Sequence, residues 1–166
     1  MSYRDEMKLE IEKLLEQIPP HEKQIDRVIR RVYARALEES KRTGSSIESM
    51  TYEILEGIEN GLSSSPELIE ETLQRASLLI ADLLHHSAKE DIAKKERKIA
   101  LAKAALLQTV EAERQHLMES LDAFRAYAQE HQYREFQKSL HVTSSTIMQY
   151  VLKLAGEIMY NHEQAK

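Results

Sequence analysis

The fold of this chain is decided by residues 67 to 155, which read ELIE ETLQRASLLI ADLLHHSAKE DIAKKERKIA LAKAALLQTV EAERQHLMES LDAFRAYAQE HQYREFQKSL HVTSSTIMQY VLKLA. This stretch contains neither glycine nor proline, the residues that most often interrupt helices, and it is built mostly from strong helix formers. It predicts an all-α protein. We expect an elongated helical bundle with one long helix and about six helices in total.

The composition limits the classes of function. The chain has 166 residues, of which 42% are hydrophobic, so it can build a core of its own. Aromatic residues make up only 5% and tryptophan is absent, which disfavours a flat platform for stacking bases or sugars. The net charge of -5 disfavours a general binder of polyanions, and nucleic acid is therefore not a favoured partner.

Two further features of the sequence bear on location. The absence of cysteine excludes disulfides, thiolate metal ligands and cysteine nucleophiles, and it fits a cytoplasmic protein. The N-terminal sequence MSYRDEMKLE is too charged for a signal peptide. No apolar run approaches the roughly 20 residues of a membrane-spanning helix, so we expect no membrane association.

The first third of the chain predicts three short helices. Apolar residues share one face over residues 3–17 before two prolines end that helix. Residues 20–42 carry the cleanest helical pattern, with apolar residues at steps of three and four. Gly44 can end this helix in the left-handed conformation. Ser45 and Glu48 have the spacing of a capping box for the third helix.

Gly57 and Gly61 lie four residues apart on one face at the end of the third helix. Glycine inside a helix costs about 1 kcal/mol relative to alanine. Two interpretations remain open: the glycines let a neighbouring backbone approach closely, or this end of the helix is frayed.

The character of the chain changes at His85. A serine and a proline at 65 and 66 begin a helix whose apolar stripe continues to this histidine. From His85 to Lys98 the only large apolar residue is Ile92. Such a segment is a solvated helix, a kink or a junction, and we favour a junction or kink near residues 85–87.

Beyond this segment, apolar residues recur at steps that resemble the seam of a coiled coil. The seam residues, which we predict to form an interface, are Ile99, Leu106, Val110, Leu117, Leu121 and Phe124. A helix over residues 87–131 would be roughly 65 Å long, whereas a final helix starting near residues 143–146 would span about 27 Å. The short helix cannot cover the long one. The uncovered seam therefore predicts a homodimer with helix packing between chains.

These patterns divide the chain into an N-terminal helical bundle, residues 1–86, and a long helix with a C-terminal return helix, residues 87–166. One continuous domain is the alternative organisation. The final helix is apolar on most of its faces, with Met148 and Leu152 outside its main stripe.

The sharpest enzyme hypothesis is a ferritin-like di-metal carboxylate site, which uses Glu-x-x-His pairs on the helices of a bundle. Glu113 and His116 match this spacing, and Asp82 with His85 matches it more loosely. About one such acid–histidine pair is expected by chance in a chain of this composition, so the motif is weak. We expect no cofactor, and the sequence leans against an enzyme.

Three arginines form a second candidate site. Arg27, Arg31 and Arg35 repeat every four residues and make one ridge, so they could bind an anion or, weakly, a nucleic acid. Interleaved acidic residues favour ion pairs within the helix instead. The favoured function is that of a scaffold, adaptor or regulatory module that acts through protein–protein contacts, as a homodimer or with a further protein partner.

Overall fold

The computed structural model describes residues 2–19, 21–98 and 103–164. These ranges contain six α-helices and one turn of 3-10 helix and, over the same ranges, no strand. The α-helices are α1 (Tyr3–Leu15), α2 (Glu22–Thr43), α3 (Ile47–Gly61), α4 (Ile69–Lys98), α5 (Lys103–Glu130) and α6 (Arg134–Gln164), and the 3-10 turn η1 (Pro66–Leu68) leads into α4. The prediction of an all-α bundle with about six helices is confirmed.

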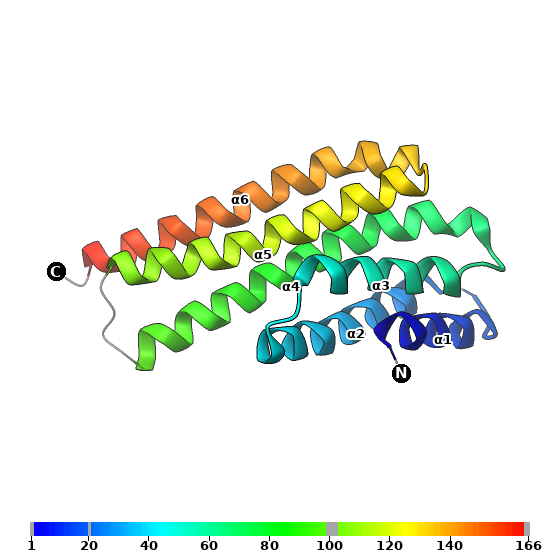
Figure 1. Cartoon of the computed structure of the whole chain (residues 1–166), viewed down its shortest axis with the longest axis horizontal. Coiled ribbons are helices and arrows are strands. Elements are labelled where there is room, and N and C mark those ends of the chain that lie inside the picture. The colour runs from blue at the N-terminus through cyan, green and yellow to red at the C-terminus, as the bar shows by residue number, and fades with distance from the viewer. Residues whose placement is uncertain (1, 20, 99–102, 165–166) are drawn as a thin grey trace.

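The helices form an elongated bundle in which α4, α5 and α6 run along the long axis, with the three shorter helices against part of their length (Figure 1). The chain reverses direction between α4 and α5 and again between α5 and α6 (Figure 1). α3 packs on α1, α2, α4 and α5, whereas α6 contacts only α4 and α5 within the described residues. One long side of α6 therefore faces away from the bundle.

The two glycines of α3 explain how α1 is docked. A Cβ atom on Gly57 would lie 2.6 Å from the carbonyl oxygen of Arg4 and 2.7 Å from the Cβ of Met7, and one on Gly61 would lie 2.8 Å from the Cβ of Ile11. Such distances are too short for non-bonded atoms, so only glycine permits this approach. Of the two interpretations left open by the sequence, close approach of a neighbouring backbone is confirmed.

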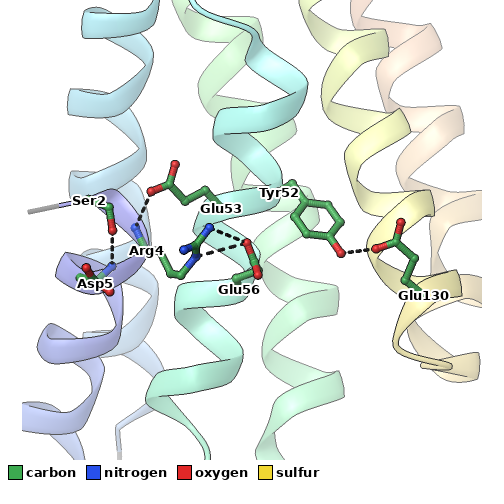
Figure 2. Close-up of polar contacts among 7 residues, drawn as sticks. All are labelled: Ser2, Arg4, Asp5, Tyr52, Glu53, Glu56 and Glu130. Atoms are coloured by element: carbon green, nitrogen blue, oxygen red, sulfur yellow. Dashed lines mark hydrogen bonds and ion pairs between the residues drawn. The ribbon is translucent and has the colours of Figure 1, made fainter.

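Polar contacts fix α3 on both sides (Figure 2). On one side the Arg4 guanidinium of α1 donates to Glu56 at 3.0 Å and 3.2 Å, and its backbone amide donates to Glu53 at 3.4 Å. On the other side the Tyr52 hydroxyl donates to Glu130 at the end of α5. α3 thus bridges α1 and the end of α5, with polar contacts to both.

The loop between α2 and α3 follows the sequence signals closely. Gly44 adopts φ 75° and its amide donates to the carbonyl of Ser40 at 2.8 Å, which closes α2 as predicted. The cap of α3 lies one residue later than expected, because the Ser46 hydroxyl accepts from the amide of Ser49 at 3.1 Å. Neighbouring serines offer the same chemistry, so spacing alone could not choose between them.

The junction predicted near residues 85–87 is wrong, because α4 continues through them to Lys98. The other form of that prediction, a kink within a continuous helix, stays a prediction. In this part of α4 the buried positions are His85, Ala88 and Ile92. A helix can bury a stripe of small and medium side chains where its neighbours approach closely, so few large apolar residues are needed. The predicted domain boundary between residues 86 and 87 lies inside this helix.

The single helix predicted over residues 87–131 is also wrong. It is divided between the end of α4 and the whole of α5, which run in opposite directions. The final helix begins at Arg134 rather than near residues 143–146, after a turn in which Gln132 adopts φ 58°. α4, α5 and α6 have 30, 28 and 31 residues, about 45 Å each at 1.5 Å per residue. Helices of equal length cover one another.

The core has a large and a small part. The large part takes buried residues from all six helices, including Met7, Ile29, Ile54, Ile80 and Phe136. The small part lies where only α4, α5 and α6 meet, and it consists of Ala88, Ile92, Leu106, Val110 and Leu154.

Candidate interaction surface

The seam predicted as an interface lies inside the protein. Leu117, Leu121 and Phe124 are at most 1% exposed in the large core, and Leu106 and Val110 are buried in the small one. Ile99 lies outside the described residues. The sequence placed this seam against a second chain because the final helix was predicted to be too short to cover a long one. That reason does not hold, because α4 and α6 are as long as α5. Homodimerisation itself stays a prediction, but it needs another surface.

The arginine ridge of α2 binds α1 rather than an open face. Arg31 donates to Glu10 at 2.8 Å, and Arg35 pairs with Glu6. Arg27 lies with Glu22, Lys23 and Gln24 around a shallow pocket at the start of α2. The sequence predicted ion pairs for this ridge but placed them within α2; the acids that bind Arg31 and Arg35 belong to another helix.

The two acid–histidine pairs do not assemble into one site. Glu113 is buried, and its carboxylate lies 3.3 Å from Nδ1 of His116. Asp82 approaches His86, at 3.5 Å, and not His85 as the sequence suggested. Over residues 2–19, 21–98 and 103–164, no three side chains of histidine, cysteine, aspartate or glutamate gather in a way that could hold a metal ion.

His85 is instead part of the contact between α4 and α6. Its ring stacks on Tyr150, with centroids 4.1 Å apart and planes 8° from parallel. Its Nδ1 is buried without a hydrogen-bond partner among the described residues. Burial lowers the pKa of His85, and the positive charges of Lys89 and Lys153 act in the same direction. A neutral, stacked imidazole suits a packing role.

A cluster of aromatic rings and carboxylates holds the turn between α5 and α6 against α3. Glu59 accepts a hydrogen bond from the Tyr133 hydroxyl and lies 3.6 Å from Nδ1 of His131. Tyr127 is fully buried, and its ring stacks on His131 with centroids 4.1 Å apart. Burial raises the pKa of both tyrosines, and the hydrogen bond to Glu130 raises the pKa of Tyr52 to about 12. The rings of Tyr127, His131 and Tyr133 are thus packed against one another.

A groove of about 380 Å³ separates the end of α2 from α4. Lys41 crosses it and donates to Asp91 at 2.5 Å and to the hydroxyl of Ser87. Glu38, Glu90 and Lys94 also line the groove, so both signs of charge are present. The pairing of opposite charges connects α2 to α4. Because both signs are present, the groove favours neither anionic nor cationic ligands.

The outward side of α6 differs from all of these regions. Of the six large apolar side chains exposed in the described part of the chain, three lie on α6: Val142 (61% exposed), Met148 (43%) and Leu152 (68%). Five exposed positions follow one another at steps of three and four, and we call them the α6 seam: Val142, Ser145, Gln149, Leu152 and Gly156. None of the five carries a charge.

The position of the α6 seam follows from the inner face of the helix. Leu140, Ile147 and Leu154 are buried and recur every seven residues. At 100° of rotation per residue, positions two or five residues beyond a buried residue lie roughly on the opposite side of the helix. The seam therefore points away from α4 and α5. In the sequence, Met148 and Leu152 already stand out as apolar residues outside the main stripe of this helix. Only the burial pattern shows which side of the helix is uncovered.

Comparison with protein-family models, with curated proteins and with solved structures finds no match to this chain. None of the described helices is both long enough and apolar enough to cross a membrane.

Proposed function

We propose that this protein acts through protein–protein contacts as a homodimer, and that the α6 seam is its contact face. The observation that carries the proposal is the exposure of Val142 and Leu152 on a helix side without charge at any of its five seam positions. Burying apolar surface contributes about 25 cal/mol for each Å² removed from water. An uncharged face is also the part of a chain of net charge -5 on which two copies repel least.

The size of the α6 seam sets the expected strength. It spans 15 residues from Val142 to Gly156, about 21 Å along the helix axis. A standard interface buries roughly 800 Å² on each partner, which is more than one short helix face provides. We therefore expect a reversible dimer that dissociates on dilution, rather than an obligate one.

The test replaces one seam residue and one matched residue elsewhere. Leu152→Glu places a carboxylate in the contact and brings like charges together in a dimer, so we expect a single-chain mass of 19.2 kDa at every concentration. Leu9→Glu is the control, because Leu9 is also an exposed helical leucine (41%) but lies on α1. The measurement is light scattering coupled to size-exclusion chromatography over a hundredfold range of concentration.

We expect the unchanged protein and Leu9→Glu to approach two chains at the highest concentration. A single-chain mass for the unchanged protein throughout the range would contradict the homodimer. A dimer that persists in Leu152→Glu would show that the contact face lies elsewhere.

The two alternative functions draw less support from the residues that suggested them. A metal site could use Glu113 and His116, which lie together but without a third ligand among the described side chains. An anion site could use Arg27, whose two neighbours on the ridge bind α1. The α6 seam offers exposed surface, and neither alternative explains it.

A further inference from the structure

We propose that the two α6 seams pair antiparallel, in a register that places Val142 of each copy against Leu152 of the other. This inference rests on the proposed homodimer and specifies its geometry. The occupant of the seam is a second copy of this chain, related by a two-fold axis that crosses α6 at the level of Ile147.

The spacing of the α6 seam selects the kind of helix contact. Steps of three and four place Val142, Gln149 and Gly156 at one heptad position and Ser145 and Leu152 at the other. Two helices with this pattern pack side by side at about 20°, along their whole shared length. Because the seam points away from the buried positions of α6, the remaining helices of each copy lie on opposite sides of such a pair.

Charge decides between the two directions. In a parallel pair related by a two-fold axis, each residue at a seam position faces its own copy. Lys138 shares the heptad position of Ser145 and Leu152, so it would lie against Lys138 of the second copy. Lys138 is exposed on α6, and like charges across an interface are unfavourable. The parallel arrangement is therefore disfavoured.

The antiparallel register removes this repulsion and matches the sizes of the side chains. It places the two large seam residues, Val142 and Leu152, in the same layer, and it does so twice because of the two-fold symmetry. Ser145 faces Gln149 between these layers, where a hydroxyl and an amide can form hydrogen bonds. Each apolar residue thus meets an apolar residue, and each polar residue meets a polar one.

The ends of the pairing are complementary in charge. Lys138 lies four residues before Val142 and faces Gly156 of the second copy in this register. The site of a glycine leaves room for the lysine stem, since no atom of a neighbouring described residue lies within 4 Å of a Cβ on Gly156. Glu157 follows directly and offers the lysine an opposite charge. The side chain of Lys138 is 76% exposed and is free to turn from Glu135, which lies 3.6 Å away on the same helix.

The chain has no cysteine, so single cysteines can be introduced to report distances without background. A disulfide requires Cβ atoms about 4 Å apart. Val142→Cys and Leu152→Cys are prepared as separate proteins, mixed at equal concentration and oxidised gently. We expect the mixture to give a cross-linked dimer and each protein alone to give at least fivefold less. In the proposed register the two copies of residue 142 are ten residues apart along the axis, about 15 Å.

Other outcomes overturn the register in ways that can be told apart. Efficient cross-linking of Leu152→Cys with itself would mean a parallel pair. A dimeric mass by light scattering without cross-links at either position would mean that the homodimer forms through another face. A single-chain mass for the unchanged protein, together with no cross-links, would end the proposed function as well. Circular dichroism of each variant confirms that the exposed substitutions leave the helices intact.

Discussion

α3 and α6 each carry glycine on a helix face, but the two faces have opposite surroundings. On α3, Gly57 and Gly61 lie directly beneath α1, and a single added carbon atom would meet its backbone or side chains. On α6, Gly156 lies on an exposed face, and an added carbon would meet nothing within 4 Å. The first face is covered by the same chain, and the second is not covered by any described part of it.

The difference shows that glycine in a helix has two distinct roles in this protein. On α3 it is required by the position of α1, and its cost in helix stability is offset by close packing. On α6 no packing among the described residues requires it, so the cost remains. We propose that a second copy of the chain covers this face of α6. The proposal rests on the exposed side chains of Val142 and Leu152 and not on the glycine.

The largest effect should come from Gly57→Ala. The new Cβ would lie 2.6 Å from the carbonyl oxygen of Arg4, so α1 must shift away from α3. Overpacking of this kind costs about 1 to 3 kcal/mol, and the gain in helix propensity offsets part of it. We expect a net fall in the free energy of unfolding, measured by urea denaturation with circular dichroism. Unchanged or increased stability would mean that α1 does not approach α3 so closely.

The matched substitution Gly156→Ala should have the opposite sign. The added methyl group meets no neighbouring atom within 4 Å in the described part of the chain, and alanine is favoured over glycine in a helix by about 1 kcal/mol. We expect stability to rise by up to this amount, less if the end of α6 frays. The same urea titration measures it. A loss of stability comparable to that of Gly57→Ala would show that another part of the same chain covers the outward side of α6.

The smallest effect should come from Arg31→Ala, which removes an ion pair at the edge of the α1 cover. Arg31 donates to Glu10 at 2.8 Å, but its side chain is 56% exposed. Exposed pairs contribute about 0.2 to 1 kcal/mol, and salt screens them. We expect a loss in this range that shrinks at high salt. Arg27→Ala serves as the control on the same ridge, and an equal loss there would mean that the pair with Glu10 contributes nothing specific.

The sequence predicted the elements that depend on local signals. The apolar pattern of α2, the stop at Gly44 and the end of α3 at Gly61 all follow from spacing and backbone preference, and each lies where it was expected. Local chemistry determines these features, so neighbouring residues suffice to predict them.

The errors lie in the stretch without glycine or proline. Within it, no helix breaker marks the turn that separates α5 from α6, which is made by Gln132 at φ 58°. The segment from His85 to Lys98 was predicted to be a junction because it has only one large apolar residue. The small residue Ala88 is part of its buried stripe, and a count of large residues leaves it out. The role of Leu117 and its neighbours depended on which helices cover α5, a tertiary property that periodicity does not contain. The same limit hid the α6 seam.

The aromatic cluster around Glu59 has a consequence for spectroscopy. The protein has no tryptophan, so its near-ultraviolet absorbance and fluorescence come mainly from seven tyrosines. Three of them, Tyr52, Tyr127 and Tyr133, lie together where α3 meets the end of α5 and the following turn. Tyrosine optical signals therefore weight this junction strongly. They offer a label-free measure of whether α3 remains docked on the end of α5 and the turn that follows it.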